Sequence, residues 1–279
     1  MEHIKISRLY KVILAIILIG FAVIQIYPFF WLILFSLKDN SEIFGGNVLG
    51  LPQRFLWQNY QSALVNGSVG LYFSNSVIVT SATILISGLL SSMVSYVIGR
   101  MNWKYGNVTL LYFTLGLMMP IHAALLPLFL MLKYAGILNS YWALIIPYVG
   151  FAMPLSINIM VNFFATIPKE LEEAASIDGA NIYQTFGLIM LPLLKPVLAA
   201  ASIFTYIASW NELMFAVTFV SKKEFRTLTV GIMSMVGQYS TNWGPIGAGL
   251  VVATVPTVIA YILMSKDIQK SLTAGAVKG

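Results

Sequence analysis

The sequence predicts an all-α membrane protein with six transmembrane helices, and two observations support this: the composition and the length of the apolar runs. Apolar residues make up 58% of the 279 residues and charged residues only 9%, whereas soluble domains average roughly 25% charged residues. So few charges could not cover a water-facing surface, and lipid must therefore be the main solvent of this chain. The apolar runs are continuous rather than alternating, which indicates spanning helices and not the strands of a barrel.

Six stretches reach the length of about 20 mostly apolar residues that a spanning helix requires. They cover residues 12–35, 72–98, 108–132, 141–164, 193–220 and 246–264. Together they form one membrane domain over residues 12–264, between a short segment 1–11 and a tail 265–279. The first stretch exceeds the core of about 7–15 residues of a signal peptide, so we expect a retained helix. Several stretches contain proline, which predicts kinked helices.

The placement of basic residues predicts a multi-pass protein of the cytoplasmic membrane with both termini in the cytoplasm. With that orientation, ten of the 16 Lys and Arg residues fall inside and six, Lys38 among them, fall outside. Two longer outside segments, 38–71 and 221–245, mix aromatic with amide side chains. They could form an interfacial aromatic belt or contact an external protein, and the composition leaves both interpretations open.

Several function classes lack the residues that they require. The chain has no cysteine and only two histidines, His3 and His122, so we expect no disulfide scaffold, thiolate nucleophile or metal centre. It contains no G-x-x-x-x-G-K-[ST] phosphate loop, so ATP is not expected to bind here, and it has neither a G-x-S-x-G nor an H-E-x-x-H motif. The basic residues are scattered between apolar runs, a pattern that does not fit nucleic-acid binding.

The long inside interruption at residues 165–195 is expected to carry the function. Four of the ten acidic residues lie in it: Glu170, Glu172, Glu173 and Asp178. The pattern predicts a short surface helix, because Thr166 could cap its N-terminus, Pro168 suits its first turn and the glutamates lie at the positive end of its dipole. Gly179 would then permit a left-handed C-terminal cap.

One face of this helix is small or apolar, and nothing else in the chain obviously covers it. The face is formed by Leu171, Ala174, Ala175 and Ile177. A helix with such a face could lie in the groove of a partner protein. It could equally be a solvated connector between two spanning helices, and the residues alone leave both interpretations open.

The spacing of this segment resembles the EAA loop of ABC-importer permeases. The resemblance is carried by Glu173-Ala174-Ala175, Gly179, Ile189 and Leu191-Pro192. In that family the loop forms a coupling helix that sits in a cleft of the ATPase subunit and transmits its closure to the membrane helices. The resemblance therefore implies an ATPase contact made by Glu172, Glu173, Ala174, Ala175, Asp178 and Gly179.

Further elements resemble the carbohydrate branch of that family, in particular the smaller permease of maltose and oligosaccharide importers. They are Asn59-Tyr60, Ala63-Leu64, Ser209-Trp210-Asn211-Glu212 and the tail 272–279. The resemblance implies the type I ABC importer permease fold and the import of a sugar. It also implies the partners: a second, related permease, two ATPase subunits that bind ATP and Mg²⁺, and an external solute-binding protein. No cofactor is expected in this chain itself.

Glu212 is the only acidic residue within a predicted spanning stretch, and an intramembrane carboxylate usually faces the bundle interior or a watery cavity. With Trp210 and Asn211 it could line the sugar path, since an aromatic ring suits the apolar face of a pyranose and polar groups suit its hydroxyls. Alternatively, Glu212 orders local helix packing. His122 is expected to be a packed, hydrogen-bonded histidine.

Three alternative functions remain open. An ion-coupled secondary transporter would be expected to carry more charges within its spans. An ABC importer permease for a solute other than a sugar would share the loop at 165–195. A membrane-bound enzyme would need a catalytic constellation, of which the sequence shows no sign.

Overall fold

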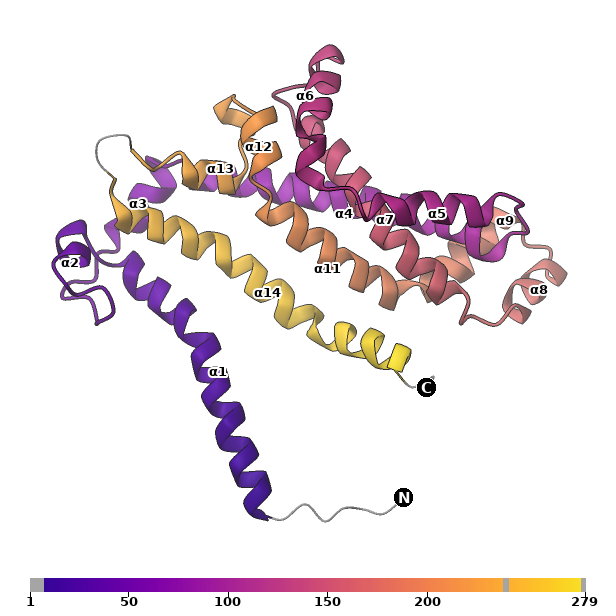
Figure 1. Cartoon of the computed structure of the whole chain (residues 1–279), viewed down its shortest axis with the longest axis horizontal. Coiled ribbons are helices and arrows are strands. Elements are labelled where there is room, and N and C mark those ends of the chain that lie inside the picture. The colour runs from indigo at the N-terminus through magenta and orange to yellow at the C-terminus, as the bar shows by residue number, and fades with distance from the viewer. Residues whose placement is uncertain (1–7, 238–240, 277–279) are drawn as a thin grey trace. The chain divides into compact units, whose positions relative to one another are not determined.

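The computed structural model describes residues 8–237 and 241–276, and the regular structure in this part of the chain is helical (Figure 1). For residues 8, 9 and 263–276 the description is limited to the helical backbone. The helices fall into two compact units. One comprises Met1–Val69 and Ile232–Thr254, and the other comprises Gly70–Gly231 and Val255–Gly279.

The first unit contains one long apolar helix, two short helices and the first part of the last helix. These are α1 (Arg8–Ser36), α2 (Asn40–Phe44), α3 (Gln58–Val65) and α14 (Trp243–Ala276), which continues into the other unit. The side chains of α1 are exposed from residue 10 to residue 30. A helix that is apolar all round and that its own unit leaves exposed needs an apolar cover.

Lys38 holds the segment between α2 and α3 in place. Its side chain is fully buried, and Nζ donates to the carbonyl oxygens of Asn47 (2.5 Å), Val48 (3.2 Å) and Gly50 (2.7 Å). An ammonium group has three donors, and here all three find backbone acceptors. Lys38, one of the six basic residues counted outside, is therefore buried and hydrogen-bonded within the segment that follows it.

The second unit is a bundle of longer helices joined by short helical turns. Its main helices are α4 (Val69–Arg100), α5 (Gly106–Gly116), α6 (Leu125–Tyr134), α7 (Trp142–Phe164), α8 (Glu170–Ile177), α11 (Lys195–Asn211), α12 (Met214–Phe219) and α13 (Leu228–Met233). The short turns are η1 (Ile121–Ala124), α9 (Ile182–Gln184), the π-helical η2 (Thr185–Met190), α10 (Leu191–Leu193) and η3 (Lys223–Phe225).

Two buried apolar clusters hold this unit together. One joins α7 to α4, α6, α12 and α13, and its members include Leu144, Tyr148, Phe215 and Phe219. The other joins α4, the end of α7, η2 and the start of α11; its members are Tyr96, Met160, Phe164, Met190, Leu194, Val197 and Ala201. The second cluster lies beside α8, so it positions the candidate site.

Four helices are long and apolar enough to cross a membrane, and two bent helix pairs raise the number to six if each pair is one span. The four are Tyr10–Ser36, Val69–Arg100, Trp142–Phe164 and Trp243–Ile262. Prolines stand inside three of these helices without ending them: Pro28, Pro147, Pro154 and Pro256. The predicted number of spans is therefore reached only with two interruptions that the apolar pattern did not reveal.

The third predicted stretch, 108–132, is wrong as a continuous helix. α5 ends at Gly116, and the helical segment that begins at Ile121 is bent by 94° from it. Pro120 lies in the break with an extended backbone (ψ 114°). Proline has no N–H to donate to the preceding turn, so it favours an interruption at this point.

The fifth predicted stretch, 193–220, is also interrupted. α11 ends at Asn211, Glu212 is extended (φ −68°, ψ 129°), and α12 begins at Met214. The preceding helical segment, Ile182–Leu193, is bent by 72° from Lys195–Asn211. Glu212 therefore lies in a break between two helices and not within a helix.

Candidate functional site: the surface helix α8

The helix predicted within 165–195 is present as α8, but it does not begin as expected. The Thr166 hydroxyl donates to Phe163 O at 2.8 Å and so closes the end of α7. Pro168 precedes the helix, and Lys169 occupies the N-cap position without a side-chain capping bond. The predicted cap by Thr166 and the placement of Pro168 in the first turn are therefore wrong, because α7 ends only two residues before Thr166.

The other end of α8 has the predicted left-handed glycine. Gly179 has φ +80°, its N–H bonds to Ser176 O (3.1 Å), and the N–H of Ala180 bonds to Ala175 O (2.9 Å). This pair of bonds is a Schellman motif, which satisfies carbonyls that the helix end would leave unpaired. The N–H of Asp178 bonds to Ala174 O at 2.9 Å within the same turn.

The predicted small-residue face of α8 is divided between two sides of the helix. Ala175 is 5% exposed, whereas Ile177 is 86% exposed and Leu171 and Ala174 are also exposed. Glu172, one turn before Ala175, points the same way as Ala175 and is engaged within the chain, while Glu173 is exposed. The expectation that nothing in the chain covers this face is therefore wrong for Ala175.

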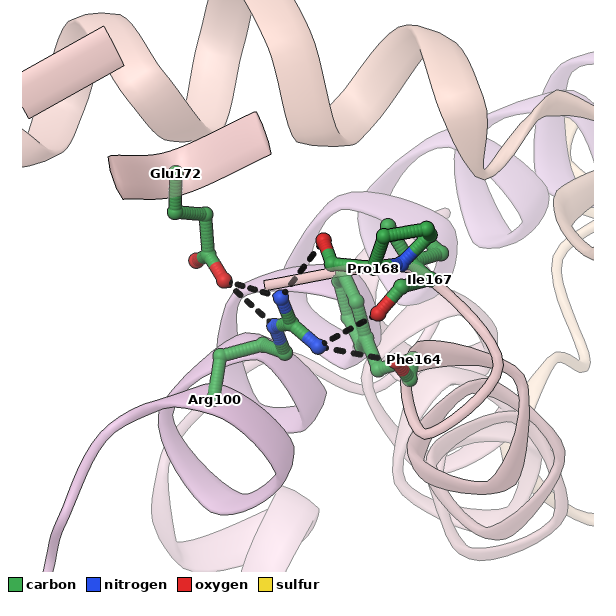
Figure 2. Close-up of polar contacts among 5 residues, drawn as sticks. All are labelled: Arg100, Phe164, Ile167, Pro168 and Glu172. Atoms are coloured by element: carbon green, nitrogen blue, oxygen red, sulfur yellow. Dashed lines mark hydrogen bonds and ion pairs between the residues drawn. The ribbon is translucent and has the colours of Figure 1, made fainter. Parts of the chain in front are cut away.

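Arg100, the last residue of α4, engages Glu172. Its Nε donates to Glu172 Oε2 at 2.5 Å, and Nη2 forms an ion pair with the same oxygen (Figure 2). Nη1 donates to the carbonyls of Phe164 (3.2 Å) and Ile167 (2.9 Å), and Nη2 donates to that of Pro168 (3.2 Å). The two side chains are only 4% and 21% exposed.

Sequence reasoning missed the role of Arg100, which it counted only as a basic residue on the inner side. The available signal was a single basic residue at the end of one apolar stretch and an acidic cluster after another. Arg100 and Glu172 are 72 positions apart, and no local pattern links them. Their pairing requires the fold.

Beyond Gly179 the chain continues into a second exposed turn. Asn181 and Gln184 form a reciprocal capping box at 2.9 and 3.0 Å. Such a box satisfies two helix N–H groups at once. Tyr183 and Leu188 follow with exposed side chains, so apolar groups continue at the surface after α8.

Trp210, Asn211 and Glu212 do not converge on one site. Trp210 is buried, with its ring 5.5 Å from that of Tyr206 and 5.9 Å from that of Phe73. The Asn211 amide donates to Ile207 O at 2.9 Å, within its own helix. A pocket of about 130 Å³ is lined by Glu212 but by neither neighbour.

His122 does not match the expectation of a packed histidine. It lies in η1 with an exposed side chain, and its ring meets Phe215 edge-on at 6.3 Å. Among the described residues, no group of three or more His, Cys, Asp or Glu side chains could hold a metal ion.

The described helices, with up to six spans and a short acidic helix held at the ends of α4 and α7, define a polytopic membrane protein. Residues 91–266 match the sequence profile of the family described as "Binding-protein-dependent transport system inner membrane component". The chain belongs to this family and is thus the permease of a binding-protein-dependent ABC importer.

Relatives from three organisms align over nearly the whole chain. The "Trehalose/maltose transport system permease protein MalG" of Thermococcus litoralis is 35% identical over 273 residues, which are 96% of this chain and 97% of that protein. The "Diacetylchitobiose uptake system permease protein NgcG" of Streptomyces coelicolor is 32% identical over 276 residues (98% and 90%). The "Probable ABC transporter permease protein YurM" of Bacillus subtilis is 35% identical over 253 residues (91% and 84%).

Solved structures confirm the fold. A chain of a bacterial ABC transporter involved in the import of the acidic polysaccharide alginate superposes with a TM-score of 0.82 at 22% identity, covering 95% of this chain and 99% of that chain. A chain of the MetNI methionine ABC transporter superposes with a TM-score of 0.54 at 19% identity, covering 76% and 97%. The predicted ABC importer permease fold is thus confirmed.

Family membership also settles which component this is. The matched description is that of the inner membrane component, so the chain is a multi-pass permease and not the ATPase of its system. In such systems ATP binds to partner ATPase subunits, and a binding protein and further permease subunits complete the importer. Membership excludes the secondary transporter and the membrane-bound enzyme.

Proposed function

We propose that this permease imports a carbohydrate and that α8 is the coupling helix that docks onto an ATPase subunit. The sugar assignment is supported by relatives whose names specify trehalose and maltose, diacetylchitobiose and sulfoquinovosyl glycerol. The docking assignment is supported by the geometry of α8 itself.

The observation that carries the docking proposal is the difference between the two sides of α8. One side is held by its own chain through Glu172 and Ala175, while the other presents Glu173, Ala174 and Ile177 to the surroundings. A large apolar side chain that is 86% exposed, as Ile177 is, favours a partner groove in which it becomes buried. The acidic groups indicate that the groove carries basic residues.

The proposed cycle follows from this contact. ATP and Mg²⁺ bind to two partner ATPase subunits, whose closure displaces α8 in this chain and the matching helix in a second, related permease. The displacement switches the bundle between two packings, so that the path opens alternately to either side. The second permease in this cycle is implied by membership of the family, whose importers contain further permease subunits.

The proposed orientation places both termini and residues 165–195 in the cytoplasm. Segments 38–71 and 221–245 then face the solute-binding protein. The positive-inside rule supports this arrangement, with ten basic residues inside and six outside. Residues 1–11 and 265–279 would be cytoplasmic, with the membrane domain at 12–264.

Copurification tests the docking proposal. The chain is expressed with its companion permease and ATPase subunits, and the amount of ATPase recovered with the tagged permease is measured. We expect Glu173→Lys and Ile177→Asp to reduce this recovery and to abolish uptake, while membrane insertion remains intact. The matched control is Glu224→Lys, a charge reversal at an exposed acidic residue of η3. Wild-type recovery and uptake in both α8 variants would refute the assignment.

A substrate panel tests the sugar proposal. Uptake of maltose, trehalose and diacetylchitobiose is measured in proteoliposomes that contain the complete importer and its binding protein, with methionine as the non-sugar solute. Competition among the sugars without competition by methionine is the expected outcome. Transport of methionine alone would assign the permease to a different solute class while leaving its ATPase coupling intact.

For Glu212 we propose a structural role in preference to contact with the sugar. Its carboxylate is engaged by Tyr148 and by two backbone N–H groups, which leaves little free capacity for a ligand. The buried position of Trp210 and the intrahelical bond of Asn211 argue in the same direction.

A further inference from the structure

The guanidinium group of Arg100 has no unused donor. Arginine carries five N–H donors in a planar fork, and the five contacts of Arg100 go to Glu172 twice and to the carbonyls of Phe164, Ile167 and Pro168 once each. A saturated and nearly buried guanidinium has one available orientation. It therefore fixes the position of the Glu172 carboxylate relative to the three backbone carbonyls.

Three of these contacts close the end of α7. Phe164 is the last residue of that helix, and the two other carbonyls belong to the turn that follows it. Carbonyls at a helix C-terminus lack intrahelical partners and carry a partial negative charge, so a cation is favourable there. Arg100 thus joins the end of α4 to the end of α7.

The remaining contacts hold the start of α8. That helix has no side-chain cap at Lys169, and the ion pair with Arg100 anchors its first turn to α4. Glu172 suits this position because a carboxylate is favourable near a helix N-terminus.

The residues before Arg100 continue the same junction. Tyr96, one turn earlier on α4, places its ring 5.8 Å from Phe164 and 5.3 Å from Phe186 in η2. At Gly99 an added Cβ would lie 3.3 Å from the Cβ of Phe164, so the absence of a side chain permits the close approach of α4 to α7. The end of α4 is therefore packed rigidly enough for Arg100 to act as a fixed point.

We propose that Arg100 is the positioning residue that fixes α8 to α4 and α7, so that a displacement of α8 moves both spanning helices with it. This inference rests on the proposed docking of an ATPase to α8, because the displacement has to come from that partner. Without Arg100, the first turn of α8 loses its ion pair with α4 and its link to the carbonyls at the end of α7. The ATPase could then still bind and hydrolyse ATP, while the displacement of α8 would move α4 and α7 less.

The test uses the complete importer and a pair of spin labels. The natural chain has no cysteine, so Asn162→Cys on α7 and Ser176→Cys on α8, both exposed, give a clean label pair in this chain. Distance distributions are recorded by pulsed EPR without nucleotide and after trapping with ATP and vanadate. They are compared among the parent, Arg100→Gln, Arg100→Lys and Glu172→Gln, with Lys104→Gln as a matched removal of a nearby exposed positive charge.

We expect the parent and the Lys104→Gln control to give one narrow distribution in both states. Arg100→Gln and Glu172→Gln should lose the narrow peak, and Arg100→Lys should not restore it, because lysine cannot reproduce the planar fork. An unchanged narrow distribution in both Arg100→Gln and Glu172→Gln would overturn the proposal. If Arg100→Gln fails to assemble, Glu172→Gln decides alone, since it removes only the ion pair.

The functional arm measures ATP hydrolysis and the uptake of maltose and trehalose in proteoliposomes. Arg100→Gln should retain ATP hydrolysis and ATPase recovery while uptake per ATP falls about tenfold, a typical size for a coupling free energy. A ratio of uptake to ATP hydrolysis equal to that of the parent would overturn the proposal. Failure of the ATPase to copurify with the parent chain would instead count against the proposed function, and the label distances would still test Arg100.

Discussion

The Tyr148 hydroxyl donates a hydrogen bond of 2.7 Å to Glu212 Oε2, and this bond joins the first half of α7 to the break between α11 and α12. The same carboxylate accepts from the N–H groups of Phe215 (2.8 Å) and Ala216 (3.1 Å) at the start of α12. Three donors thus stabilise a charge that would be costly in an apolar bundle. The break leaves N–H groups at the start of α12 without helical acceptors, and the Glu212 carboxylate accepts from them. These N–H groups in turn stabilise the carboxylate.

Truncating Glu212 should destabilise the permease. Glu212→Ala leaves the Tyr148 hydroxyl and two helix N–H groups without their acceptor, and we expect a loss of about 1–3 kcal/mol of stability. Thermal unfolding of the purified chain in detergent measures this. Glu212→Gln keeps an acceptor oxygen and should be milder. A Glu212→Gln variant of normal stability that has lost uptake would show that Glu212 contacts the solute.

Replacing Lys38 should loosen the segment between α2 and α3. Lys38→Met retains the apolar stem but leaves three carbonyl oxygens without a donor, which should cost about 1–3 kcal/mol locally. Hydrogen exchange of residues 45–51 should accelerate. Lys133→Met, at an exposed position, is the matched control, and equal exchange in the two variants would contradict the structural role of Lys38.

Gly179 should be sensitive to a side chain for conformational reasons alone. Gly179→Ala forces a residue with a Cβ into a left-handed conformation, at a cost of about 1–2 kcal/mol. We expect weaker recovery of the ATPase with the permease. Gly179→Asn should be tolerated better, because asparagine accepts this conformation. Gly187→Ala is the matched control, since an added Cβ there meets no atom within 4 Å.

α2 should respond to acid through Asp39. A hydrogen bond from the Ser41 side chain and one from the Glu42 N–H lower the pKa of Asp39 below its ordinary value of 3.8. A lowered pKa in the folded state means that the ionised carboxylate stabilises α2 above that ordinary value. This contribution is lost as the pH falls through the folded-state pKa. Hydrogen exchange at Glu42, corrected for its intrinsic rate, should show this loss, and Asp39→Asn should abolish the pH dependence.

Features coded by neighbouring residues could be predicted from the sequence. The long apolar runs, the short helix after Pro168 and the left-handed Gly179 all follow from local composition or conformation. Glu212 was recognised as unusual, but its capping of the following helix was not, because an apolar run through residue 220 hides the break. Local sequence patterns therefore predict that a segment is helical far better than they predict where a helix in lipid is interrupted.

The contacts of Lys38 and Arg100 could not be predicted, and both failures share a physical cause. Each cation binds mainly backbone carbonyl oxygens, which every residue possesses, so the sequence contains no matching partner to find. The one side-chain partner, Glu172, is 72 positions from Arg100. Only the fold brings these groups together.

The junction at Arg100 has a consequence for assembly of the importer. Because Arg100 holds the first turn of α8 and Gly179 closes its end, the helix is already ordered in the permease before any partner arrives. A preorganised surface spares an incoming subunit the entropic cost of ordering a loop, about 0.5–1.5 kcal/mol for each immobilised side chain. Encounter, rather than folding of the segment, would then set the rate at which the subunits join.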